Sequence, residues 1–126
     1  MKNPQRSIAL GSLFALLGVI LGAFGAHALE DTLLQNGTTS SWSTAVSYQM
    51  WHAFALIACG ILQRGGCILG KAAICFAVGI LLFSGSIYWL SLDGPRWLGP
   101  ITPIGGLSLI IGWALLITAQ FRKEKT

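Results

Sequence analysis

Four apolar runs of about 20 residues constrain the fold of this 126-residue chain more than any other feature. A helix needs about 20 apolar residues to cross a hydrocarbon core of about 30 Å. The predicted spans are residues 8–29, 45–62, 72–92 and 101–121. Only 10% of the residues are charged, whereas a soluble domain carries about 25%. We therefore expect an all-α polytopic membrane protein, in which residues 1–126 form a single four-helix domain.

The basic residues predict the orientation of these spans. Arg96 lies alone in a connection on one side of the membrane, and the other seven lysines and arginines lie on the side of the two termini. These seven are Lys2, Arg6, Arg64, Lys71, Arg122, Lys123 and Lys125. Because an excess of positive charge marks the cytoplasmic side, we expect both termini in the cytoplasm or, in mitochondria, in the matrix. The net charge of +4 then reflects topology, and nucleic-acid binding is not expected.

The end of the first run resembles a signal-peptide cleavage site, because Ala26-His27-Ala28 has the A-x-A form. The apolar stretch before it is longer than the roughly 7 to 15 residues of a usual signal peptide, so we expect the span to be retained. An apolar stripe through Leu33 predicts that the first helix continues to Asn36-Gly37, a usual helix stop. The second helix is then expected to start with Ser41 or Ser43 as its N-cap.

Small residues line one face of the first and of the fourth predicted span. The two stripes comprise Gly11, Gly18, Gly22 and Gly25 in the first span and Gly105 and Gly112 in the fourth. Small residues let helices approach closely and gain van der Waals contacts in lipid. The simpler interpretation is packing within the four-helix bundle, and the alternative is a contact between copies of the chain in a homo-oligomer.

Polar side chains converge on the outer half of the predicted bundle. Six residues form this set: His27, Tyr48, Gln49, His52, Ser84 and Tyr88. Polar groups in hydrocarbon are costly unless they are paired, so the polar face of the second span should point inward. We predict a shallow polar pocket that opens outward and binds a ligand. Trp42, Trp89 and Trp97 fall near the same interface, where indole rings are favoured.

Four ordered motifs support a resemblance to a known family: "GAFGAHAL", "WSTAVSYQMWHAFAL", "LFSGSIYWLSLDG" and "LGPITPIGGLSLIIGW". The chain resembles the YgdD and transmembrane-protein-256-like family, small membrane proteins also described as domain of unknown function 423. The similarity extends from Gly18 to Trp113. It implies a four-helix protein of a bacterial inner membrane, or of the mitochondrial inner membrane in a eukaryote. It implies no reaction, so no catalytic residue is carried over.

Two alternative chemistries use the predicted polar residues. His27 and His52, with Glu30 as a further ligand, are candidates for a haem or metal site, although no metal-binding sequence motif is present. A path for protons or cations would lead from His52 through Cys59 and Gln63 to the cytoplasm.

The simplest function for this sequence is that of a non-enzymatic accessory or scaffold protein. The chain contains no catalytic motif, since Ser84 and Ser86 lack a nucleophile elbow and an acid within the spans. We expect it to bind a lipid, a quinone or a larger membrane complex through the outer polar pocket. The expected partners are the lipid bilayer and a homo-oligomer or larger complex. No cofactor is expected, and haem or quinone is the alternative.

Overall fold

The computed structural model describes residues 1–123, and these residues are helical with no strands among them. The elements are α1 (Pro4–Ala26), α2 (Glu30–Asn36), α3 (Thr39–Arg64), α4 (Gly70–Gly79), the π-helix η1 (Ile80–Ser84), α5 (Gly85–Ser91), the 3₁₀-helix η2 (Arg96–Leu98) and α6 (Ile101–Lys123). The stretches long and apolar enough to cross a membrane are Pro4–Ala26, Thr39–Arg64, Gly70–Ser91 and Arg96–Arg122. The predicted all-α fold with four spans is confirmed.

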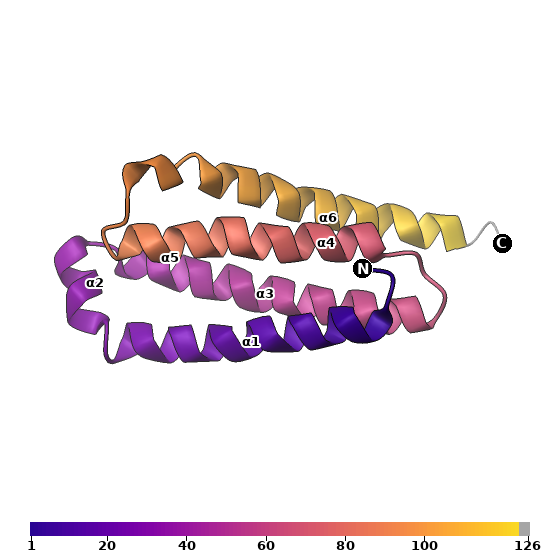
Figure 1. The fold of residues 1–126 in the computed structure, drawn as a ribbon, viewed down its shortest axis with the longest axis horizontal. Coiled ribbons are helices and arrows are strands. Elements are labelled where there is room, and N and C mark those ends of the chain that lie inside the picture. Colours follow the sequence, from indigo (N-terminus) through magenta and orange to yellow (C-terminus); the bar gives the residue numbers. More distant parts are fainter. Residues whose placement is uncertain (124–126) are drawn as a thin grey trace.

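The molecule has two ends that serve as reference points. The start of α1 and the connection between α3 and α4 lie at one end, which we call the terminal end, and α6 runs back towards it (Figure 1). The opposite end carries α2, and we call it the α2 end. The cytoplasmic location of the termini stays a prediction. Lys125, which contributes to the charge argument, lies outside the described residues.

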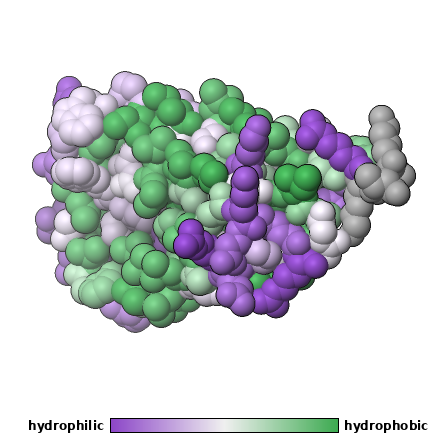
Figure 2. Space-filling model, turned by 45° about the vertical axis from the view of Figure 1, so that its right-hand side comes forward, coloured by the Kyte–Doolittle hydropathy of each residue, from purple (hydrophilic) through white to green (hydrophobic). Residues whose placement is uncertain are grey.

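The four spans follow one another across the molecule in the order α1, α3, α4 to α5, and α6 (Figure 1). The central span α3 packs on α1 and on α4, η1 and α5, whereas α6 packs mainly on α4 and η1. In the most apolar window of each span, 44% and 39% of the residues of the two central spans are buried, against 17% in α1 and in the last span. Figure 2 shows hydrophobic residues over much of the surface and hydrophilic ones gathered towards the terminal end. The flanking spans therefore offer their apolar side chains to lipid.

The first helix is shorter than the sequence predicts, because the chain breaks at His27. The backbone of His27 leaves helical geometry (φ −128°, ψ −85°), and α2 then crosses the end of the molecule (Figure 1). The break lets Leu33 reach the interior, where only 1% of its surface is exposed. Full burial of a leucine stabilises a fold by about 1.5–3 kcal/mol. The predicted continuous helix to Asn36 is therefore wrong, whereas the stop at Gly37, which has a φ of 67°, is confirmed.

The second spanning helix, α3, starts earlier than predicted. It begins at Thr39 with Thr38 as its N-cap, so neither Ser41 nor Ser43 is the cap. The Thr38 hydroxyl donates instead to the backbone carbonyl of Ser91 (2.8 Å), which joins the start of α3 to the end of α5. This tertiary contact explains the difference, and it adds the serine-rich stretch to the helix.

The third span contains a π-helical turn near its middle, η1, between α4 and α5. A π turn accommodates an additional residue and changes the direction of the side chains that follow. At the end of this turn the buried Ser84 donates to the backbone carbonyl of Ala45 on α3 (2.7 Å). The irregular turn thus coincides with a hydrogen bond between the two central spans.

Candidate functional site

The predicted glycine stripes lie at tight contacts between helices. A methyl group at Gly11 would lie 2.7 Å from the backbone carbonyl oxygen of Ala53, and one at Gly105 would overlap the backbone of Leu82 and Phe83. Gly18 and Gly25 face Met50 and Trp42 of α3, and Gly112 faces the ring of Phe76. At Gly22 the contact is looser, since a methyl group would lie 3.4 Å from Val46, an ordinary distance. The seam between α1 and α3 is therefore tight at Gly11, looser at Gly22, and tight again at Gly25, where the indole of Trp42 lies against α1.

Gln49 joins three spans in the interior, with only 3% of its surface exposed. Its Nε2 donates to the backbone carbonyl of Phe14 on α1 (2.8 Å), and its Oε1 accepts from the hydroxyl of Tyr88 on α5 (2.6 Å). A buried amide with both ends bonded avoids the cost of an unpaired polar group. Gln49 and Tyr88 therefore hold α1, α3 and α5 together.

Both ring nitrogens of His52 are engaged. Its Nδ1 lies 2.7 Å from the backbone carbonyl oxygen of Tyr48, and its Nε2 lies 3.0 Å from the indole Nε1 of Trp113 on α6. An indole nitrogen only donates, so Nε2 accepts and Nδ1 carries the proton that bonds to Tyr48. The ring is neutral in this arrangement. Coordination of a metal or haem iron by His52 would require one of the two hydrogen bonds to break.

Three residues of the predicted outward pocket are packed in the interior. Gln49, His52 and Ser84 are buried, and their hydrogen bonds go to other protein groups. The ring of Tyr48 packs against those of His52 and Phe83, with centroid distances of 5.8 and 4.7 Å. The polar side chains form a packed network, which we call the Gln49–His52 network, and ligand binding by these residues stays a prediction. The network comprises Tyr48, Gln49, His52, Ser84, Tyr88 and Trp113.

His27 lies apart from this network. It is exposed at the end of α1 and borders a surface hollow of about 330 Å³ together with Ile20, Ala23, Phe24 and Ala28. His52, in contrast, is buried near the middle of α3. Residues 1–123 contain no group of three or more histidine, cysteine or acidic side chains placed to hold a metal ion. The structure therefore does not bring His27, Glu30 and His52 together as a ligand set.

The predicted permeation route is packed with protein atoms at Cys59. Cys59 is fully buried in the hydrophobic core. Gln63 accepts a hydrogen bond from the hydroxyl of Ser7 (3.2 Å) and donates to the backbone carbonyl of Met1 (2.9 Å). Like Gln49, it serves to bind one helix to another.

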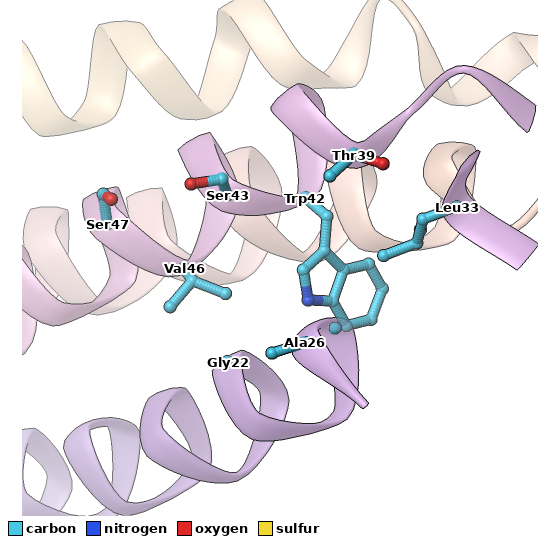
Figure 3. A pocket seen from close by; sticks show the side chains of 9 residues that line it. Gly22, Ala26, Leu33, Thr39, Trp42, Ser43, Val46 and Ser47 are labelled. Atoms are coloured by element: carbon cyan, nitrogen blue, oxygen red, sulfur yellow. The ribbon is translucent and has the colours of Figure 1, made fainter. Parts of the chain in front are cut away.

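An open cavity lies beside the network, between α1, α2 and α3 (Figure 3). It has a volume of about 260 Å³, and we call it the Trp42 cavity. Its lining residues are Gly22, Gly25 and Ala26 of α1, Leu33 of α2, and Thr39, Trp42, Ser43, Val46 and Ser47 of α3. The lining combines small and apolar side chains with three hydroxyl groups and carries no charge. Such a lining suits an uncharged molecule with a few polar atoms.

Trp42 fixes the shape of this cavity. Its indole reaches from α3 towards α1 (Figure 3), where Nε1 donates to the backbone carbonyl of Leu21 (2.9 Å). Only 4% of its surface is exposed, whereas Trp89 and Trp97 are 56% and 63% exposed. The position near the interface was predicted for all three tryptophans, but Trp42 turns inward and packs on the ring of Tyr88 (4.7 Å).

Sequence reasoning missed the hydroxyl face of the cavity because it expected the second helix to start at Ser41 or Ser43, which leaves Thr39 outside the helix. Once α3 begins at Thr39, the residues Thr39, Ser43 and Ser47 recur every fourth position and share one face of the helix. That spacing is visible in the sequence. It is informative only if the start of the helix is known.

Comparison with known proteins agrees with the membrane fold. The family described as "Protein of unknown function (DUF423)" matches residues 21–106. A UPF0382 membrane protein of Staphylococcus epidermidis (strain ATCC 12228 / FDA PCI 1200) is 44% identical over 116 residues, which cover 91% of this chain and 94% of that protein. The UPF0382 membrane protein YwdK of Bacillus subtilis (strain 168) is 42% identical over 119 residues, with coverage of 91% and 95%. No solved structure matches the chain significantly.

Proposed function

Because the chain belongs to the DUF423 family of small membrane proteins, whose relatives here are bacterial, we propose a role that depends on the membrane itself. The protein is a non-enzymatic accessory protein that binds an amphiphile through the Trp42 cavity. The amphiphile has an uncharged head with acceptor oxygens, a class that includes neutral lipids and quinones. The observation that carries this proposal is the combination of three hydroxyl residues, Thr39, Ser43 and Ser47, with an apolar and uncharged lining in an open cavity.

The chemistry of the lining supports this class of ligand. The hydroxyls of Ser43 and Ser47 are suitable donors to carbonyl or ester oxygens. Leu33, Val46 and the small residues of α1 offer apolar contact to the remainder of the head. A charged head is disfavoured, because no lysine, arginine or acidic side chain lines the cavity.

The size of the cavity suits one part of a molecule. Its volume of about 260 Å³ is slightly below the roughly 300–1,000 Å³ of sites that enclose a whole drug-sized ligand. We therefore propose that the head enters the cavity while the apolar tail stays in the surrounding lipid. Haem and metal binding are not part of this proposal, because His52 already uses both ring nitrogens.

The experiment compares molecules retained by the purified protein and by a variant in which the cavity is filled. In Ser43→Leu a larger apolar side chain replaces a lining hydroxyl at an exposed position of α3. The matched control is Ser41→Leu, which places the same side chain at an exposed position of α3 outside the lining. Each protein is purified in mild detergent, and the bound small molecules are quantified by mass spectrometry and visible absorption.

We expect the wild type and Ser41→Leu to retain one uncharged amphiphile per chain and Ser43→Leu to lose most of it. The mass and spectrum of the molecule distinguish a lipid from a quinone. Equal retention by the two leucine variants, or no stoichiometric molecule in the wild type, would contradict the proposal.

A further inference from the structure

A second and larger cavity lies at the terminal end of the molecule, whereas the Trp42 cavity lies towards the α2 end. It has a volume of about 570 Å³ and lies between the beginning of the chain, the end of α3 and the start of α4. The residues that matter for its chemistry are Lys2, Gln63, Cys67, Ile68, Lys71 and Ile74. We call it the Cys67 cavity. Hydrophilic side chains gather at this end of the molecule next to the hydrophobic side surface (Figure 2).

Hydrogen bonds hold the polar side of the Cys67 cavity in place. Gln63 bonds both to the hydroxyl of Ser7, which is fully buried, and to the backbone carbonyl of Met1. The same carbonyl lies so close to Gly70 that a methyl group there would be 2.8 Å from it. These contacts place the first residues of the chain against α3 and α4. Lys2 and Lys71 therefore border one cavity although 69 positions separate them in the sequence.

The other side of the cavity is apolar and open. Ile68 is 93% exposed and Ile74 is 46% exposed. Ile68 belongs to the short connection between α3 and α4, where the helices leave the membrane. A fully exposed isoleucine beside lysines is typical of the boundary between acyl chains and headgroups, where apolar groups contact lipid and ammonium groups extend to the phosphates.

The distribution of charge favours an anionic occupant. Lys2 and Lys71 line the cavity without an acidic neighbour in its lining. The acidic residues that the structure describes, Glu30, Asp31 and Asp93, belong to α2 and to the connection after α5, at the α2 end. An anion at the Cys67 cavity therefore meets attraction from two lysines, and no acidic side chain belongs to the lining.

We propose that the Cys67 cavity binds one anionic phospholipid. Its phosphate lies between the ammonium groups of Lys2 and Lys71, and the first part of an acyl chain lies against Ile68 and Ile74. The site is independent of the Trp42 cavity, which has an uncharged lining at the opposite end of the protein. It would fix the position of the chain in the leaflet that faces the termini.

The first test measures lipid affinity. Phosphatidylglycerol or phosphatidylcholine is titrated into the detergent-solubilised full chain, and the bound lipid is counted by native mass spectrometry. We expect tighter binding of phosphatidylglycerol by the wild type and a loss of about fivefold in affinity for each lysine removed in Lys2→Gln and Lys71→Gln, because each such lysine contributes about 1 kcal/mol. The control is Arg122→Gln, which removes an exposed charge from α6 outside the lining and should leave the affinity unchanged.

A second readout locates the lipid without any substitution. Cys67 lines the cavity and Cys75 does not, so alkylation of each thiol is followed by peptide mass spectrometry in the same sample. We expect phosphatidylglycerol to slow alkylation of Cys67 and not of Cys75, and phosphatidylcholine to slow neither.

Three results would overturn this proposal. One is an affinity for phosphatidylglycerol that is equal in the wild type and in a variant that combines Lys2→Gln with Lys71→Gln. Another is a loss in Arg122→Gln as large as that in Lys71→Gln, which would indicate diffuse attraction to the basic end. The third is protection of Cys67 by glycerol phosphate alone to the same degree, which would assign the cavity to free phosphate compounds and not to a lipid.

Discussion

The Gln49–His52 network and the Trp42 cavity adjoin each other along one helix, and both contain polar side chains of α3. In the network, Gln49 and His52 face neighbouring spans that supply hydrogen-bond partners: α1 and α5 for Gln49, and α6 for His52. In the cavity, Thr39, Ser43 and Ser47 share an open space with Gly22, Gly25 and Ala26, the small residues at the end of α1. These small residues of α1 offer no polar side chain to the three hydroxyl groups. The same kind of residue is thus structural in one place and available to a ligand in the other.

The largest expected effect comes from the tight part of the seam between α1 and α3. Gly11→Val would force α1 away from the backbone of Ala53, so we expect the free energy of unfolding to fall by about 3 kcal/mol. Gly22→Ala, beside the cavity, should change it by less than about 0.5 kcal/mol because its methyl group has ordinary space. Both values are measured by denaturant unfolding in detergent. Equal effects would show that the seam is uniform and would remove the basis of the comparison.

A smaller loss is expected when the network loses its central amide. Gln49→Ala removes two hydrogen bonds between spans and leaves the hydroxyl of Tyr88 without its partner. We therefore expect the free energy of unfolding to fall by about 2 kcal/mol. Ser47→Ala removes a polar group from the cavity lining and serves as the control, with an expected change near zero. If both variants lost similar stability in the same assay, the distinction between a filled and an open polar site would fail.

The smallest effect is expected at the contact between α6 and α3. Trp113→Phe keeps an aromatic ring against Phe76 but removes the donor to His52. Hydrogen bonds between membrane helices contribute about 0.6 kcal/mol on average, so the loss of stability should be of that order. Nitrogen NMR of the imidazole checks the mechanism: the wild type should show a proton on Nδ1 alone, and the variant a mixture of tautomers. A wild-type ring protonated on Nε2 would contradict the assigned hydrogen bond.

The spans could be predicted from the sequence because the length of an apolar run is a local property. The break at His27 could not, since Ala26-His27-Ala28 contains neither glycine nor proline and the break is favoured by the burial of Leu33 several residues later. The start of α3 depends in the same way on a contact between Thr38 and the carbonyl of Ser91. Each of these two errors concerns only the end of one predicted helix. Together they conceal the Trp42 cavity, which lies between the two misplaced helix ends.

For the candidate site, the sequence predicts the polar face of α3 but not which of its side chains are hydrogen-bonded within the protein. Helical periodicity identifies Tyr48, Gln49 and His52 as an inward polar face, and the structure places Gln49 and His52 inside. Periodicity does not tell whether a partner such as Trp113, 61 residues later, satisfies the ring of His52. Polar side chains that are free to bind a ligand and those that are hydrogen-bonded within the protein have the same sequence pattern. The positions of the neighbouring residues distinguish the two cases.

The bond between Trp113 and His52 has a consequence for biosynthesis. The spans enter the membrane in chain order, so α3 is in place before α6 has been made. Until α6 arrives, Nε2 of His52 has no indole donor and the ring of Phe76 lacks its aromatic neighbour. Docking of the last span satisfies both at once. A chain that ends before α6 therefore leaves an unpaired polar atom within the bilayer, where such an atom is costly.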